Sequence, residues 1–211
     1  SIPESPELTQ RLSALDTLKL DPIQLFQQYG PLRAAGGVKP TPDEQKARRQ
    51  QARIIVQQAQ DARVLRALYS GRQLEEVMTQ FWFNHFNVFA QKGLDHIWVG
   101  AYERDATRPY ALGHFRDLLL ATAKSPAMLF YLDNWQNSAP GSRLPGGREA
   151  GINENYAREV MELHTLGVDG GYGQADVVSL AHILTGWGLA RARQPPPDRT
   201  EIGRAACRER G

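Results

Sequence analysis

The sequence predicts an all-α protein, folded as an irregular antiparallel helical bundle of about seven to nine helices. Apolar residues recur with helical spacing along most of the chain, and no alternating strand pattern runs for more than a few residues. Short connections separate the successive periodic stretches, which favours antiparallel packing of neighbouring helices. With 41% hydrophobic residues, the 211-residue chain is able to bury a sizeable core.

The first elements are expected to be short. Residues 6–18 form an amphipathic piece, and the stretch DPIQLFQQYG then predicts a helix with Asp21 as its N-cap, Pro22 at its first position and Gly30 at its end. A glycine-rich loop follows.

A long helix is predicted over residues 41–69. Thr41 is its N-cap, Pro42 takes the first turn, and Glu44 three residues after the cap completes a capping box. Its apolar residues form only a narrow stripe, so most of its surface is expected to face water. Docking of a partner helix along this stripe is a second interpretation.

The helix at residues 72–89 is expected to be the central one, because its apolar side is broad. That side carries Leu74, Val77, Met78, Phe81, Trp82, His85, Phe86 and Phe89. Further helices are expected at 96–106, 111–124, 126–133, 153–166 and 174–186, with proline and glycine at the breaks.

Charge and composition exclude several classes of partner. The 25 basic and 23 acidic residues alternate in sign along the chain, so nucleic acid is not an expected partner. No apolar run approaches the roughly 20 residues that span a bilayer, and the SIPESPELTQ start has no signal-peptide pattern. Oligomeric state cannot be predicted from the sequence.

Three segments are expected: short helices and a loop over 1–40, a helical core domain over 41–190, and an extended, disordered tail over 191–211. The last eleven residues, EIGRAACRERG, contain the only cysteine, Cys207, and resemble one reading frame of a sequencing adapter. We therefore expect them to be artefactual and leave them out of the fold.

Polar side chains in the helix at 72–89 line up along one side. Glu76, Gln80, Asn84, Asn87 and Gln91 recur at spacings of three and four residues. A solvent-facing stripe explains them, and the functional alternative makes Asn84 and Asn87 hydrogen-bonding groups in a pocket beside His85. A third interpretation is that the amides cap backbone groups of neighbouring loops. His85 lies between Phe81 and Phe89, which indicates a hydrogen-bonded core histidine or a metal ligand.

The stretch ENYAREVMELHTLGV places many ionisable groups on one predicted helix. Glu154 suits the helix N-terminus after Asn153, and Arg158 can pair with Glu154 or Glu162. Asn155, Glu159 and Glu162 share one side, with His164 turned toward the apolar face. Glu159 and Glu162 are candidate ligands of a divalent metal or an acid–base pair, and an ion-pair network is the structural alternative.

Three segments, FWFNHFNVF, FRDLLLATAKSPAMLFYLDNWQN and INENYAREVMELHTLGVDGGYGQADVVSLAHILTGWG, resemble the bacterial family called domain of unknown function 1800 over residues 70–190. The resemblance implies a truncated member, export or a cell-envelope location, and a partner of sulfatase-like type. The polar motif positions are Asn84, His85, Asn153, Glu154, Asn155, Arg158, Glu159, Glu162, His164, Asp176 and Trp187. Departures from the family pattern are Tyr110, Ser125 and Gly173.

We expect the helices at 72–89 and 153–166 to pack face to face. Asn84, Asn155 and Arg158 would then be binding groups, beside the catalytic candidates His85, Glu159, Glu162 and His164. His85, Glu159 and Glu162 are also the candidate metal ligands. Such a cluster suits a hydrolase-like or metal-dependent enzyme. The alternative is a non-catalytic helical scaffold or binding domain in which the cluster is structural.

Overall fold

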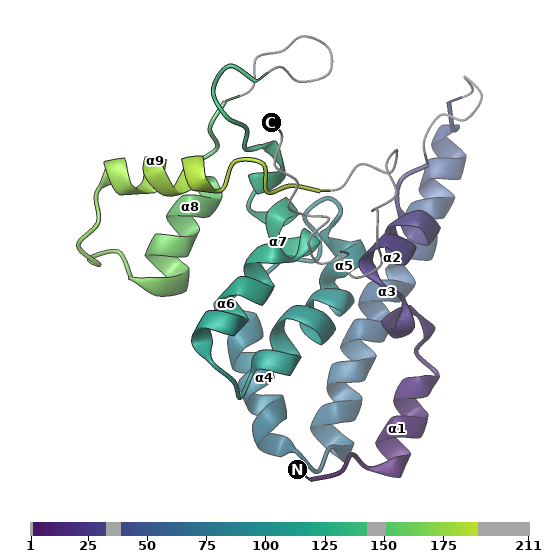
Figure 1. Ribbon diagram of the computed structural model, residues 1–211. Coiled ribbons are helices and arrows are strands. Elements are labelled where there is room, and N and C mark those ends of the chain that lie inside the picture. The colour runs from purple at the N-terminus through teal and green to yellow at the C-terminus, as the bar shows by residue number, and fades with distance from the viewer. Residues whose placement is uncertain (1, 33–38, 143–150, 190–211) are drawn as a thin grey trace, which may run out of the picture. The chain divides into compact units, whose positions relative to one another are not determined.

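The computed structural model describes residues 2–32, 39–142 and 151–189, and over these ranges the only regular elements are helices, as predicted (Figure 1). The chain divides into two compact units, Ser1–Leu118 and Leu119–Gly211, which are described one at a time. The predicted division at residues 40 and 190 stays a prediction. The tail from residue 190, with Cys207, lies outside the described residues.

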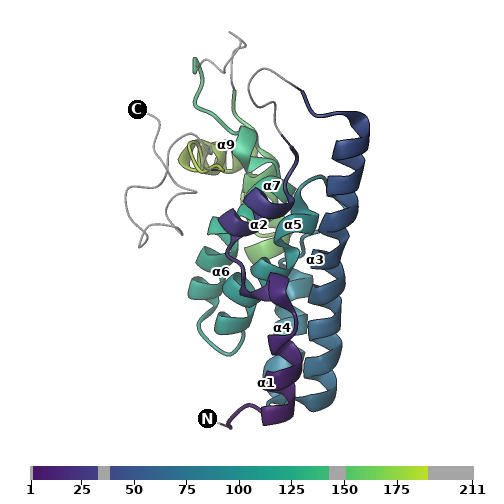
Figure 2. The same ribbon diagram turned by 90° about the vertical axis from the view of Figure 1, so that its right-hand side faces the viewer.

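The first unit is built around one long helix. Its elements are α1 (Pro6–Ser13), a 3₁₀ turn η1 (Asp16–Lys19), α2 (Pro22–Tyr29), α3 (Pro42–Tyr69), α4 (Gln73–His85), α5 (Asp95–Tyr102), a π-helical turn η2 (Glu103–Thr107) and a 3₁₀ turn η3 (Arg108–Tyr110). In both ribbon views α1 and α5 lie beside α3 (Figures 1 and 2), and α3 and α5 make the most extensive contact.

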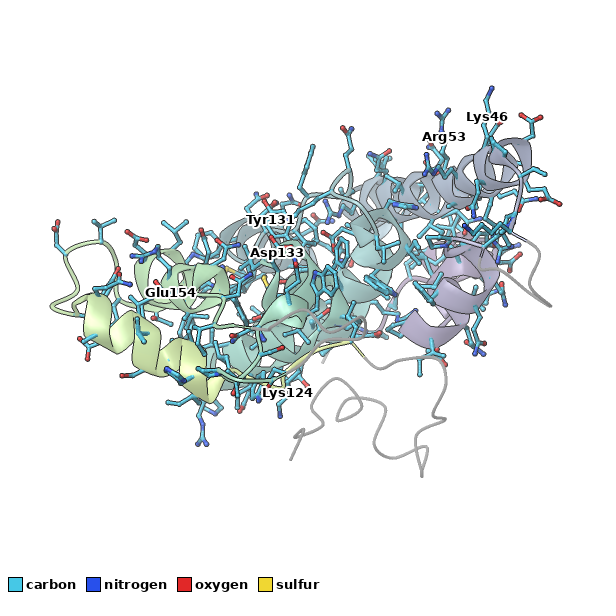
Figure 3. All side chains as sticks on the ribbon, turned by 90° about the horizontal axis from the view of Figure 1, so that it is seen from above. Lys46, Arg53, Lys124, Tyr131, Asp133 and Glu154 are labelled. Carbon is cyan, nitrogen blue, oxygen red and sulfur yellow. The ribbon has the colours of Figure 1, made fainter. Side chains whose placement is uncertain are left out.

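The predicted starts of α2 and α3 are confirmed. Asp21 accepts hydrogen bonds from the backbone N–H groups of Ile23 and Gln24, both at 2.8 Å. Thr41 and Glu44 form both halves of the capping box. Most of α3 faces water as expected, and Lys46 and Arg53 project away from it (Figure 3).

The prediction that the helix at 72–89 is central is wrong. α4 ends at His85, and its apolar side is open: Leu74, Val77 and Phe81 are 66%, 62% and 53% exposed. The buried helix is α5, in which every residue except His96 is buried. Apolar spacing identifies a helix face but not whether a neighbour covers it, whereas α5 is apolar on nearly all sides and must be enclosed.

Several helices are shorter than predicted, because the chain changes helix type. The piece at 6–18 divides into α1 and η1, and the helix expected at 96–106 passes from α5 into the π-helical turn η2. The helix expected at 153–166 likewise passes into a π-helical turn. A π turn adds a residue per turn and rotates the following side chains around the axis, which spacing rules for an α-helix do not anticipate.

The second unit contains α7 (Pro126–Tyr131), a 3₁₀ turn η4 (Asn134–Gln136), α8 (Asn155–Glu159), the π-helical turn η5 (Val160–Thr165) and α9 (Gln174–Ile183). The helix α6 (Phe115–Lys124) contains the boundary between the units. α8 and α9 pack against each other, burying Tyr156, Ala157, Val177 and Ala181 (Figure 1). None of the helices in the described ranges combines the length and apolar character needed to cross a bilayer.

Candidate functional site

The predicted site residues fall in different units. Asn84 and His85 end α4 in the first unit, whereas Asn155, Arg158 and the residues up to His164 lie on α8 and η5 in the second. Each group is therefore described by itself. The predicted face-to-face packing of the two helices stays a prediction.

His85 lies among aromatic rings, as its spacing predicts. Its ring is nearly parallel to that of Phe81 at 6.5 Å between centroids, and perpendicular to that of Phe86 at 4.6 Å. The side chain is only partly buried, and Asn84 beside it is exposed. Four of the five stripe residues, Gln80, Asn84, Asn87 and Gln91, face solvent, which favours the solvent-facing interpretation.

Glu159 and Glu162 lie where α8 continues into η5, and both are partly buried. Burial, followed by the negative charge of Glu162, raises the pKa of Glu159 above its ordinary value. A carboxyl group of raised pKa beside a second carboxylate has the chemical character of a general acid. The arrangement makes Glu159 the most chemically distinctive of the predicted residues.

His164 is buried on the inner side of the same element. Its ring meets the ring of Tyr156 at 69°, with 6.4 Å between centroids. Burial raises the pKa of Tyr156, so its hydroxyl stays protonated at all ordinary pH values. The predicted turn of His164 toward Ala157, Val160 and Met161 stays a prediction.

Arg158 connects α8 to the start of α9. Its guanidinium donates to Gln174 Oε1 at 2.8 Å and to Glu154 Oε2 at 3.4 Å, and Gln174 in turn donates to Glu154 at 2.7 Å. Of the two predicted pairings, the structure as described contains the one with Glu154 and not the one with Glu162. Arg158 thus acts as a cross-link between two helices.

Two buried asparagines that the sequence pattern did not indicate, Asn134 and Asn137, lie beside these residues. Asn134 donates to the carbonyls of Leu184 and Trp187, at 3.2 and 2.8 Å. Asn137 donates to Asn134 Oδ1 and to the carbonyl of Ala181, at 3.2 and 2.8 Å. Its own Oδ1 accepts from the backbone N–H of Asn153 at 3.0 Å.

The chain of amides continues to the start of α8. Asn153 Oδ1 accepts from the backbone N–H of Asn155 at 3.0 Å, and Asn155 Nδ2 donates to the carbonyl of Leu132 at 3.1 Å. We call Asn134, Asn137, Asn153 and Asn155 the asparagine network. It joins the segment after α7, the start of α8 and the end of α9 by hydrogen bonds to backbone groups.

The described residues do not form a complete set of metal ligands. Over the residues that the structure describes, no group of three or more histidine, cysteine, aspartate or glutamate side chains is placed to hold a metal ion. The proposed set of His85, Glu159 and Glu162 combines residues of both units, so it stays a prediction.

The comparison with known families agrees with the sequence pattern. The family model described as Protein of unknown function (DUF1800) matches residues 1–209. The chain belongs to the DUF1800 family. The match extends well beyond the 70–190 range of the predicted resemblance, into α1–α3 of this DUF1800 chain. Neither the curated proteins nor the solved structures contain a significant match.

The first unit of the DUF1800 chain contains a buried ion network that was not predicted. Glu103 accepts hydrogen bonds from Arg63 and, at 3.0 Å, from Arg108. Arg108 also makes a two-pronged contact with Glu76, with both N–O distances 2.8 Å. We call Arg63, Arg66, Glu76, Glu103 and Arg108 the arginine network.

Burial and charge oppose each other in this network. Burial alone would raise the pKa of Glu103, but the charges of Arg63 and Arg108 and their hydrogen bonds outweigh it and hold the pKa below its ordinary value. Arg108 also keeps its charge: burial would lower its pKa, but contacts with Glu76 and Glu103 raise it. Glu103 and Arg108 therefore stay ionised at neutral pH.

The network is hidden from sequence analysis by the π turn. Glu103 and Arg108 are five residues apart, and in an α-helix that spacing would direct them to different sides, about 140° apart. The π turn η2 has i to i+5 hydrogen bonding and brings them together. The sequence does contain one signal of this network, the two arginines Arg63 and Arg66 three residues apart on α3. Their acidic partners, however, come from segments that are remote in the sequence.

A cavity of about 250 Å³ lies next to the arginine network in the first unit. α1, η1, α3, α5 and η2 all contribute to its wall. The residues that line it are Leu12, Ser13, Leu18, Lys19, Ala59, Ala62, Arg66, Gly100, Glu103 and Arg104. None of them was a predicted site residue.

Proposed function

We propose that this DUF1800 chain is a non-catalytic helical domain, acting as a scaffold or binding unit, in which buried polar side chains hold the helix packing. The asparagine network is the observation that carries the proposal. Its amide groups are committed to backbone groups around Leu132, Ala181, Asn153 and Leu184. Amides used in this way satisfy buried backbone groups and have little capacity left for a substrate.

The ionised groups support the same proposal. Arg158 is occupied by Glu154 and Gln174, and Arg108 by Glu76 and Glu103. Networks of this kind perturb pKa values without any catalytic role. These networks stabilise the fold by holding neighbouring helices in one register.

Metal analysis and activity screening of the purified full chain test the proposal. We expect less than stoichiometric zinc, iron and manganese, and no hydrolysis of chromogenic carboxylic, phosphate and sulfate esters that differs between wild type and the double variant Glu159→Gln/Glu162→Gln. Stoichiometric metal or turnover that is lost in this variant would overturn the proposal. His85→Ala is assayed in parallel, because it removes the third proposed ligand from the other unit.

Hydrolysis by Glu159 and Glu162 is the second candidate function. The observation in its favour is the raised pKa of Glu159, caused by burial and by the neighbouring Glu162 charge. Glu159 would donate a proton to the leaving group while Glu162 activates water. For any ester that is turned over, this candidate requires a fall in rate on the alkaline side of the pH–rate profile, where Glu159 loses its proton, and a loss of turnover in Glu162→Gln.

A further inference from the structure

The cavity of the first unit has a charged end and an apolar body. Arg66 and Glu103 stand at the charged end, while Leu12, Leu18 and Ala59 belong to the apolar wall. In the cavity wall, Gly100 allows a close approach of α5 to α3 and η1: a Cβ atom on Gly100 would lie only 3.3 Å from Ala59 Cβ and 3.4 Å from a Leu18 methyl group. At about 30 Å³ per water, the volume suits a compound of roughly six to eight heavy atoms.

Arg66 is the least satisfied cation of the arginine network. Its side chain is 16% exposed, and its nearest acidic atom is Glu103 Oε1 at 3.7 Å, beyond hydrogen-bonding distance. In the described ranges its guanidinium donates no hydrogen bond. Burial and the charge of Arg108 lower its pKa, despite the attraction of Glu103, Glu76 and Glu4.

Within the arginine network, Arg66 has no carboxylate to itself. Three arginines, Arg63, Arg66 and Arg108, meet two carboxylates, Glu76 and Glu103. Both carboxylates are already engaged with the other two arginines. The neighbouring Glu75 pairs with Arg72 and lies 3.9 Å from Arg108, and Glu4, whose charge also attracts Arg66, accepts a hydrogen bond from Ser70.

The other cations at the cavity are engaged already. Arg104 donates to the carbonyls of Leu18 and Leu20 and to both oxygens of Asp105. Lys19 pairs with Asp16 at 2.8 Å, but the pair is exposed and therefore weak. Of the two arginines that line the cavity, Arg66 is therefore the one with donors free for an entering anion.

We propose that this cavity binds a small organic carboxylate with a short apolar chain, whose carboxylate is held by Arg66 and whose chain lies along Leu12, Leu18, Ala59 and Gly100. A planar guanidinium suits two-pronged recognition of a carboxylate. The ligand carboxylate accepts hydrogen bonds from Arg66, which donates none to the described residues, and its chain occupies the cavity. Glu103 orients Arg66 toward the ligand and repels any second negative charge.

The inference rests on the proposed function only in that the ligand is bound and released unchanged. Failure of the two proposals is distinguishable. The binding site belongs to the first unit and is tested through Arg66, whereas the non-catalytic role is tested through Glu159 and Glu162 of the second unit.

Binding of hexanoate to the full chain tests the inference by calorimetry and by nuclear magnetic resonance of backbone amides, in buffer without other carboxylates. We expect saturable binding of hexanoate, with shifts confined to residues around the cavity, and at least tenfold weaker binding of hexanol, which lacks the charge. Inorganic phosphate, which lacks the chain, is expected to bind at least tenfold more weakly as well.

Variants on one helix separate the charge from the fold. Arg66→Gln is expected to weaken hexanoate binding at least tenfold. Arg53→Gln, an equal loss of charge on the outward side of α3, is the matched control and is expected to leave binding unchanged (Figure 3). Ala59→Leu, checked for folding by circular dichroism, fills the apolar body and is expected to weaken binding as strongly.

Three results would overturn the inference: no saturable binding of hexanoate to the wild type, equal affinities for hexanoate and phosphate, or unchanged hexanoate affinity in Arg66→Gln. Each is readable without Ala59→Leu, so the test holds even if that variant does not fold.

Discussion

At the scale of single residues, Glu103 is the side chain on which most of the first unit's buried charge converges. It is 5% exposed and contacts three arginines. A surface pair such as Glu7 with Arg11, with both partners about half exposed, has no comparable role. The contribution of an ion pair to stability therefore depends on its position in the fold and not on its residue types.

Replacing Glu103 is expected to destabilise the protein strongly. Glu103→Gln leaves Arg63 and Arg66 without their buried counter-charge, which should lower the free energy of unfolding by about 3 kcal/mol. Urea denaturation followed by circular dichroism measures this. The control Glu7→Gln is expected to change the free energy of unfolding by less than about 1 kcal/mol. A similarly small loss in both variants would contradict the role given to Glu103.

The lowered pKa of Glu103 also predicts that the stability of the protein depends on pH. The pKa of Glu103 is below its ordinary value of 4.5 in the folded protein, so its stabilising contribution is complete above that value and is lost as the pH falls through the depressed pKa. The stability difference between wild type and Glu103→Gln should therefore be constant near neutral pH and shrink below pH 4.5. A difference that grows on acidification would mean that the folded pKa is raised instead.

At the scale of elements, the asparagine network links the short helices of the second unit. Asn137→Ala removes the donor to the buried Ala181 carbonyl and the acceptor of the partly buried Asn153 N–H, leaving both backbone groups without this partner. We expect a loss of about 2–3 kcal/mol in the free energy of unfolding. Asn84→Ala, at an exposed position of α4, is the control for thermal and urea unfolding and is expected to be nearly neutral.

A substitution at the start of α9 is expected to stabilise the protein instead. Gly173 is its N-cap and has no side chain to bind the first turn, although Asp176 already accepts from the Gly173 N–H at 2.8 Å. Its φ of −118° suits serine, and a Cβ atom would meet only Asp176, at 4.0 Å. Gly173→Ser should raise stability by a few tenths of a kcal/mol, visible as a small rise in melting temperature. A fall would mean that the cap cannot form.

Helix ends and helix types differ in how far they can be predicted. The caps at Asp21 and Thr41 depend on neighbouring residues only, and both were predicted correctly. The π turns that begin at Glu103 and Val160 have no comparable local signal. They are stabilised by the contacts that the side chains make once the turn has rotated them around the helix axis. The arginine network and the cavity escaped prediction for that reason.

At the scale of the whole molecule, the two compact units are expected to respond separately to local damage. Stability is distributed in contiguous cooperative segments, so Glu103→Gln should speed amide hydrogen exchange in α3 and α5 more than in α8 and α9. Exchange followed by mass spectrometry measures this. An equal increase in all four helices would show that the chain unfolds as one unit.

The sequence by itself determined the all-α class, the family and the N-caps of α2 and α3, because periodicity, caps and motif order are local properties. Only the tertiary structure decided that α5 and not α4 is enclosed, that Glu103 meets three arginines, and that a cavity opens beside Arg66. These outcomes depend on which neighbour covers each face, and such long-range contacts leave no spacing signal along the chain.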